Sequence, residues 1–235
     1  MTDLDESVRR NELRVALAAV EERITRACGE SGRARDDVTL IAVTKRFPAS
    51  DVRLLARLGV DDVGENNVQE LVAKSEVHAY AGLRLHVVGR LQSNKAAVAA
   101  SLAELIHSLD RRALIGPLAR GAARGPRRLS VLIQVSLDGD PARGGVREED
   151  VVDLAQATLD SPLRLKGVMA VPPVGADPVA AFTRLREISK QVRELCPDAE
   201  IISAGMSADL EAAVVSGATH LRVGSAILGS RRLLG

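Results

Sequence analysis

Tryptophan is absent from this chain, and aromatic residues make up only 1% of its 235 residues. A surface that stacks nucleic-acid bases on aromatic rings is therefore nearly excluded, and Leu, Val, Ile and Ala must build the core. The formal net charge of +1 gives no reason to expect nucleic acid or an anionic membrane as a partner. The basic run at residues 120–128 lacks aromatic residues and is interpreted as a solvated surface.

Cysteine is nearly as scarce, because Cys28 and Cys196 are the only two. They are too few and too far apart for a zinc site or a disulfide framework. No apolar run is long enough to span a bilayer, and the opening sequence MTDLDESVRR is acidic and polar, unlike a signal peptide. These absences predict a cytoplasmic protein without a metal site.

What the chain does have is the composition of an ordinary globular protein, with 46% hydrophobic and 27% charged residues. Near its start, Leu13, Leu17, Val20 and Ile24 follow one another at steps of three and four residues. This spacing is typical of an amphipathic helix, and we predict a helix over residues 1–30.

Eight short β-branched runs alternate with helical stretches in the rest of the chain. They span residues 38–45, 60–65, 83–89, 104–110, 128–136, 163–171, 200–205 and 219–224. Strand–helix alternation implies a parallel sheet, and eight such units predict an α/β fold, a single closed (β/α)8 TIM-type barrel. An open doubly wound sheet is the alternative, but the first strand lacks the Gly-x-Gly-x-x-Gly turn. No linker composition divides the chain, so we expect one domain over residues 1–235, with the barrel over 38–231.

Lys45 ends the first predicted strand, a costly place for an ammonium group near a core. Active sites of (β/α)8 barrels lie at the carboxyl ends of the strands, where Lys45 is expected. Two interpretations remain open. Lys45 is either a solvent-facing residue just past the strand, or a partly desolvated amine that attacks an aldehyde and forms a Schiff base.

The loops after the last two predicted strands read SAGMS (203–207) and RVGSA (222–226). In this architecture those loops often form a phosphate site, and Gly205 and Gly224 would let the backbone come close to phosphate oxygens. Ser207 alone reads as a helix N-cap, and Gly224 with Ser225 reads as a simple turn. Two such loops side by side, with Arg222 close by, favour anion binding. A lysine and a phosphate site together suit a phosphorylated aldehyde, such as pyridoxal 5′-phosphate (PLP) or a sugar phosphate.

The four histidines show no metal-ligand spacing. His86 and His107 lie in predicted strands that would allow them to point into the barrel. A hydrogen-bonded interior role is favoured for both over metal binding.

Five segments resemble, in this order, the pyridoxal phosphate homeostasis family of small PLP-binding barrels, which is related to the N-terminal barrel of alanine racemase. They are AVTK ending at Lys45, GENNVQE, HVVGRLQSNK, GVMAVPP and SAGMSADLEAAVVSGATHLRVGSAILGSR. The resemblance covers nearly the whole chain, from about Val38 to Arg231, and as an ordered set the segments are highly specific.

The resemblance implies that PLP is the cofactor and is held as an aldimine on Lys45. The other implied contacts are Asn66 in the pocket, and Met206, Ser207, Arg222, Gly224 and Ser225 around the phosphate. Arg222 either joins the phosphate contacts or faces the pyridine nitrogen. At that nitrogen an arginine would keep the ring unprotonated and make PLP a weaker electron sink. The glycine-rich segment 137–146 is hypothesised to move over this site.

The function that the resemblance implies is intracellular vitamin B6 homeostasis, with PLP held and delivered to apo-enzymes and without robust catalytic activity. PLP and apo PLP-dependent enzymes are the expected partners, and we expect a monomer or a weak homodimer. An amino-acid racemase is the alternative. Racemisation needs a base on each face of the substrate, and the only tyrosine, Tyr80, lies before the third predicted strand. A class I aldolase-like enzyme is less favoured, since Glu65 is the only convenient acid beside Lys45.

Overall fold

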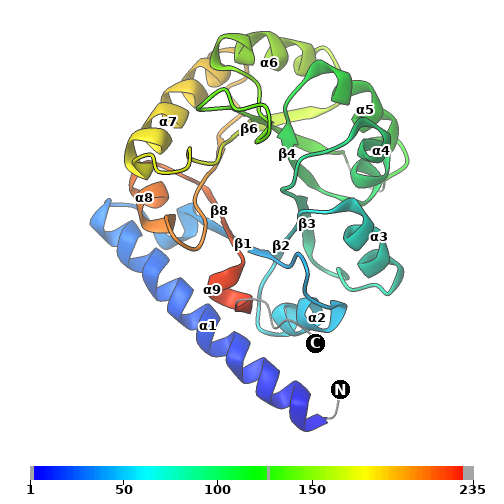
Figure 1. The fold of residues 1–235 in the computed structure, drawn as a ribbon, viewed down its shortest axis with the longest axis vertical. Helices are drawn as coiled ribbons and strands as arrows, with labels where there is room; N and C mark the ends of the chain where they lie inside the picture. The colour runs from blue at the N-terminus through cyan, green and yellow to red at the C-terminus, as the bar shows by residue number, and fades with distance from the viewer. Residues whose placement is uncertain (1–2, 126–127, 230–235) are drawn as a thin grey trace.

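All eight predicted strands are present, and they pair in sequence order into a closed parallel barrel ringed by helices (Figure 1). The computed structural model describes residues 3–125 and 128–229. The TIM-type (β/α)8 prediction is therefore confirmed, and the open doubly wound alternative is wrong. The predicted limits at residues 1 and 231 lie outside the described residues, and the division into one domain stays a prediction.

Each observed strand falls inside its predicted run and is shorter than it, because the terminal residues of the runs already belong to loops. The strands are β1 Thr39–Val43, β2 Asp62–Glu65, β3 Arg84–Val87, β4 Leu105–Leu109, β5 Ser130–Gln134, β6 Arg164–Met169, β7 Ile201–Ser203 and β8 His220–Val223. Between them lie the helices α2 Ala49–Arg57, α3 Val68–Glu76, α4 Ser93–Leu102, α5 Ile115–Ala122, α6 Val151–Leu159, α7 Pro178–Leu195 and α8 Leu210–Val215. Two further helices flank the barrel, α1 Asp3–Glu30 before it and α9 Ser225–Leu228 after it.

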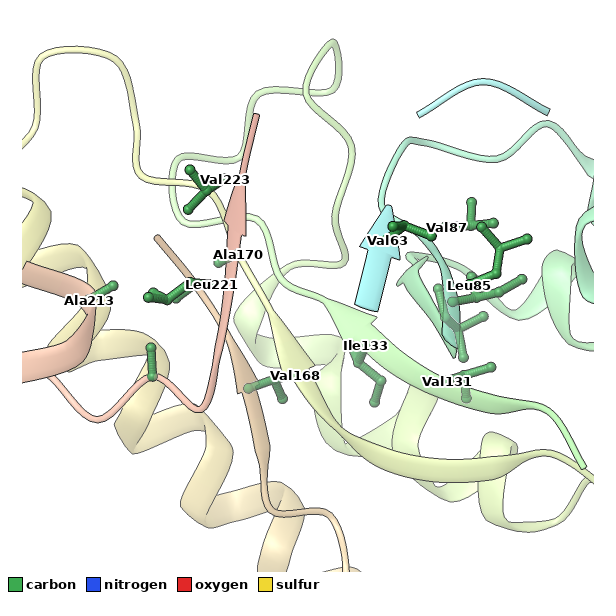
Figure 2. Packing of buried hydrophobic residues seen from close by; sticks show 14 of the residues in the cluster. Val63, Leu85, Val87, Val131, Ile133, Val168, Ala170, Ala213, Leu221 and Val223 are labelled. Carbon is green, nitrogen blue, oxygen red and sulfur yellow. The ribbon is translucent and has the colours of Figure 1, made fainter. Parts of the chain in front are cut away.

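The main hydrophobic core lies between the strands and the helices. Side chains of a strand alternate between its two faces, and most strand residues on the helix side are buried aliphatic residues. Figure 2 shows these side chains on several strands, with Leu221 of β8 against Ala213 of α8. Burial of a Val, Leu or Ile side chain contributes about 1.5–3 kcal/mol, so this layer supplies most of the apolar stabilisation.

The interior of the barrel is divided between an apolar and a polar side. Leu105, Leu132 and Met169 form a small separate cluster on the β4–β6 side. The interior also holds buried polar side chains from β2, β3, β4, β7 and β8, namely Asp62, His86, His107, Ser203 and Arg222. Barrel interiors are usually filled by branched aliphatic residues, so the polar side of this one requires its own explanation.

Helix α1 packs along the outside of the barrel against α8, α9 and α2 (Figure 1). The predicted residues Leu13, Leu17, Val20 and Ile24 are buried at that contact, which confirms the helix. Near its start, Arg9 Nη2 donates to Asp51 Oδ2 at 2.7 Å, fixing α1 to α2. Within residues 3–125 and 128–229, no helix combines the length and the apolar character needed to cross a membrane.

Gly167 of β6 provides a test of the barrel's closure. Its φ is +146°, and a Cβ there would stand 1.9 Å from the carbonyl oxygen of Ile201 on β7. Gly167→Ala should therefore push β6 from β7 and lower the free energy of unfolding by at least about 3 kcal/mol. Gly59→Ala is the matched control, because Gly59 also has positive φ (+86°) but open space around its Cβ position; it should lose about 1–2 kcal/mol. Equal losses in urea unfolding would contradict the steric explanation.

Candidate functional site

The predicted cofactor contacts lie at the carboxyl ends of four strands that are neighbours in the barrel, β7, β8, β1 and β2 (Figure 1). Arg222 lies within β8, and the other residues follow a strand: Lys45 after β1, Asn66 after β2, Met206 and Ser207 after β7, Gly224 and Ser225 after β8. The fold thus brings residues from widely separated parts of the sequence to one side of one mouth of the barrel.

Lys45 stands in a tight turn directly beyond β1. The N–H of Phe47 donates to the carbonyl of Thr44 at 3.1 Å and closes the turn. Arg46 has a φ of +66°, unusual for a residue with a side chain, and its N–H donates to Glu70 Oε2 at 2.9 Å. The Lys45 side chain is exposed just beyond the end of β1, as the first of the two interpretations has it, and its role as a Schiff-base amine stays a prediction.

A buried polar cluster supports the turn from the helix side of the barrel. Glu65 Oε1 accepts from Thr44 Oγ1 at 2.6 Å, from Lys74 Nζ at 2.6 Å and from Tyr80 Oη at 3.0 Å. Lys74 also donates to the carbonyl of Thr44 at 2.8 Å. Thr44 precedes Lys45 and Glu65 precedes Asn66, so the cluster ties together the two strand ends that carry these residues.

The same cluster corrects the suggestion that Glu65 is an acid beside Lys45 in the mouth. Asp62 and Gly64 of β2 face the barrel interior, so Val63 and Glu65 face the helices, as strand alternation requires. Burial raises the pKa of Glu65, against the opposing effect of Lys74. Burial and the Glu65 carboxylate together raise the pKa of Tyr80 far above its usual range. The only tyrosine is therefore held as a neutral donor outside the barrel.

Asn66 is exposed at the mouth and packs closely on the end of β3. A Cβ at Gly89 would lie 2.0 Å from the carbonyl oxygen of Asn66 and 2.7 Å from its Oδ1. Only glycine leaves room for this approach, which explains the glycine of the GRLQSNK segment.

Ser207 and Ser225 join the last two loops. Their Oγ atoms lie 3.1 Å apart, and the N–H of Ala226 donates to Ser207 Oγ at 3.1 Å. Ser207 is not the N-cap of α8, because that helix begins later, with Asp209 in the N-cap position. The N–H of Met206 already donates to Asp209 Oδ1 at 2.6 Å, so it is not free for a phosphate in this structure.

Gly205 and Gly224 both lie where a larger residue would be crowded. Gly205 has a φ of +86°, and a Cβ there would meet Ala213 Cβ at 2.5 Å. A Cβ at Gly224 would stand 3.2 Å from the carbonyl oxygen of Val43, so the end of β8 packs tightly on the end of β1. Glycine at these positions therefore allows the loops that carry Ser207 and Ser225 to lie close to the Lys45 turn.

Arg222 is a buried cation inside the barrel, only 5% exposed. Its Nη1 donates to Ser203 Oγ at 2.6 Å and its Nη2 to the carbonyl of Ala170 at 3.0 Å. Within the described part of the chain it forms no ion pair with a carboxylate. Burial lowers the pKa of Arg222 to about 10, with Asp209 opposing, so the group stays charged at neutral pH. A buried charge without a counter-ion is unfavourable, which favours a ligand that accepts hydrogen bonds here.

Behind Arg222, a series of side chains continues through the barrel. Ser203 Oγ lies 2.9 Å from His107 Nδ1, and His107 Nε2 lies 3.0 Å from His86 Nδ1. His86 Nε2 lies 2.9 Å from Asp62 Oδ1. The predicted interior role of His86 and His107 is confirmed. Sequence reasoning missed the connection, although these residues occupy the inward positions of their strands and alternation alone indicates that they share the interior.

Segment 137–146 lies over the other side of the mouth. Arg143 Nη2 donates to the carbonyl of Pro172, beyond β6, at 2.5 Å. Arg90, beyond β3, donates from Nη1 to the carbonyl of Pro141 at 3.0 Å. The segment therefore bridges the loops after β3 and β6, opposite the strands that carry the predicted contacts; its movement stays a prediction.

Residues 15–232 match the family model described as the alanine racemase N-terminal domain. A crystal structure of alanine racemase from Corynebacterium glutamicum has a TM-score of 0.64 at 14% identity, covering 91% of this chain and 60% of that one. That likeness shows the fold alone, and together the two findings define a barrel of the alanine racemase N-terminal class.

Closer relatives are more specific. The pyridoxal phosphate homeostasis protein of Mycobacterium tuberculosis is 42% identical over 245 residues, with 96% of this chain and 95% of the relative covered. The protein of the same name from Pseudomonas aeruginosa is 38% identical, with 92% and 94% covered. The structure of PipY of Synechococcus elongatus with PLP bound has a TM-score of 0.76 at 33% identity, covering 88% of this chain and 100% of that one. The chain belongs to the family of pyridoxal phosphate homeostasis proteins.

Removing the cation of the cluster behind Lys45 should destabilise the protein. Lys74→Met leaves the Glu65 carboxylate buried without its ion pair, which costs about 3–5 kcal/mol. The double variant Glu65→Gln with Lys74→Met removes both charges and should recover most of that loss in urea unfolding. A double variant no more stable than the single one would show that the charge on Glu65 is not the cause.

The stability contributed by Asp62 should depend on pH. Burial opposes ionisation, but hydrogen bonds from His86 and Arg84 lower the pKa of Asp62 to about 2 from its ordinary 3.8. A carboxylate with a lowered pKa stabilises the folded state above its unfolded pKa and loses that effect as the pH falls toward the folded one. Asp62→Asn should therefore cost about 2 kcal/mol at pH 7 and about 1 kcal/mol near pH 3. The exposed neighbour Asp61, changed to Asn, is the control, and a pH-independent loss for Asp62→Asn would contradict the assignment.

Proposed function

We propose that this chain holds PLP covalently on Lys45 in the cytoplasm and releases it to apo-enzymes, as part of vitamin B6 homeostasis and without robust catalysis. PLP supplies an aldehyde, which forms a Schiff base with a primary amine. The observation that carries the proposal is Arg222, a buried cation below the Lys45 turn that has no carboxylate partner among the described residues. The structure of PipY with PLP bound, at 33% identity, supports the same ligand.

The phosphate of PLP is assigned to the paired loops after β7 and β8. Ser207 and Ser225 present two hydroxyl groups 3.1 Å apart, and hydroxyl groups can donate to phosphate oxygens. Gly224 keeps the backbone of its loop free of a side chain there. Met206 is assigned to the lining of the phosphate site and not to its donors, because its N–H already donates to Asp209 Oδ1. Asn66 lines the pocket from the β2 side.

Arg222 is assigned to the pyridine nitrogen rather than to the phosphate. Its guanidinium is held inside the barrel by Ser203 and Ala170, whereas Ser207 and Ser225 lie on the loops above. Arginine only donates hydrogen bonds, so a ring nitrogen facing it remains an unprotonated acceptor. The ring then withdraws electrons weakly, which suits a protein that stores the cofactor.

The described residues around the Lys45 turn offer no second base for racemisation. Racemisation needs an acid or base on each face of the reacting carbon. The hydroxyl of Tyr80 donates to Glu65 on the helix side of β2, and Glu65 itself faces away from the mouth. The alternative function therefore has no support from the described residues.

Release to another protein requires access to the site. The side chains of Lys45, Asn66, Met206 and Ser225 are all exposed. An amine of an acceptor enzyme can reach the bond at Lys45 and displace it by exchange of one amine for another. The exposed mouth thus supports a carrier role with apo PLP-dependent enzymes as partners.

The test is the attachment site of PLP. The chain contains five lysines, and Lys45 and Lys95 are the two that follow a strand at the same mouth. Wild type and Lys95→Ala should show a visible absorbance band with PLP, and borohydride reduction followed by peptide mapping should place the label on Lys45. Lys45→Ala should lose both. Label spread over several lysines, or retained in Lys45→Ala, would overturn the proposal, and rapid racemisation by the same sample would overturn the carrier role.

A further inference from the structure

We propose that Ser203, His107, His86 and Asp62 are positioning residues for Arg222, acting as one polarised hydrogen-bond chain that runs along the barrel interior. The chain connects Arg222, near the carboxyl end of β8, with Asp62 at the start of β2. Only its last step, the contact of Arg222 with the ring nitrogen of PLP, rests on the proposed function.

The two ends of the chain fix the direction of every hydrogen bond. Arg222 can only donate, so Ser203 Oγ accepts from it and its own proton is left to donate to His107 Nδ1. A neutral His107 must then carry its proton on Nε2 and donate to His86 Nδ1. His86 in turn carries its proton on Nε2 and donates to the Asp62 carboxylate, which can only accept. One arrangement of protons satisfies all five residues.

The reverse arrangement is disfavoured by the surroundings of His107. A proton on its Nδ1 would leave a neutral His107 with no proton on Nε2, so two acceptors, His107 Nε2 and His86 Nδ1, would face each other, because His86 needs its own proton on Nε2 for Asp62. Burial, with His86, Arg222 and His220 adding to it, also lowers the pKa of His107 well below its usual value. The neutral Nε2–H form is therefore the one that anchors Ser203 and, through it, Arg222.

The far end of the chain is anchored at the opposite mouth of the barrel. Asp62 accepts from Arg84 through both oxygens, at 2.8 and 2.6 Å. A cavity of about 390 Å³ lies there, lined by Asp62, Arg84, His86 and His220 among others. This paired carboxylate orients His86 and so sets the direction of the chain from the end remote from the cofactor mouth.

The first experiment examines the protein without PLP and is independent of the proposed function. In ¹⁵N spectra of histidine-labelled protein near neutral pH, His86 and His107 should both appear as neutral Nε2–H tautomers. Ser203→Ala should remove the hydrogen bond to His107 Nδ1 and shift that nitrogen, leaving His86 as it is. A proton on Nδ1 of His107 in the wild type would overturn the chain, whether or not the protein binds PLP.

The second experiment tests the effect on Arg222. His107→Leu breaks the chain, His107→Gln keeps a donor and an acceptor, and Leu132→Val changes the apolar side of the interior without touching the chain. His107→Leu removes the acceptor of the Ser203 hydroxyl and should speed the release of PLP about tenfold, the effect of about one lost hydrogen bond, and it should shift the pH midpoint of the bound PLP absorbance. His107→Gln should recover much of both effects, and Leu132→Val should change neither. Equal effects of His107→Leu and Leu132→Val, or an unchanged pH midpoint, would overturn the positioning role.

Discussion

A guanidinium group removed from water must find acceptors for its N–H groups, and that requirement at Arg222 organises the interior of this barrel. Ser203 and the carbonyl of Ala170 meet part of it, and His107 accepts from Ser203 in turn. The polar side of the interior is the consequence, because each group in the series needs a partner until a carboxylate, Asp62, ends it. The apolar cluster of Leu105, Leu132 and Met169 lies apart from this series, on the β4–β6 side of the interior.

Strand β2 links this interior to the outside support of the site. Asp62, at its start, faces inward and ends the series that begins at Arg222. Glu65, at its end, faces the helices and gathers Thr44, Lys74 and Tyr80 behind the Lys45 turn. Because side chains alternate along the four residues of β2, its two carboxylates face opposite sides, Asp62 toward the interior and Glu65 toward the helices. One carboxylate helps to fix the cation inside the mouth, and the other fixes the loops that carry Lys45 and Asn66.

Much of this could be predicted from sequence, and what was missed has a physical cause. Short β-branched runs separated by helical stretches were sufficient for all eight strands. Glu65 was placed beside Lys45 because both end predicted strands, without regard to the face of the strand that Glu65 occupies. Counting alternate positions from Val63 turns Glu65 outward. The exposed turn at Lys45 depends on the positive φ of Arg46, which Glu70 supports, and no glycine signals it. The bond between Ser207 and Ser225 joins loops separated by a helix and a strand, so local sequence favoured an N-cap.

Under the proposed function, the arrangement of charge suits a barrel that holds a reactive aldehyde rather than one that transforms amino acids. Carbanion chemistry on PLP requires a ring that withdraws electrons, a base on each face and a site closed to water. Here the group assigned to the ring nitrogen is Arg222, which donates a hydrogen bond but keeps its proton at neutral pH. Burial lowers the pKa of Arg222 only to about 10. The tyrosine is engaged behind β2, and the lysine stands exposed. Each of these features disfavours carbanion chemistry, and an exposed lysine would ease exchange with an incoming amine, as the proposed carrier role requires.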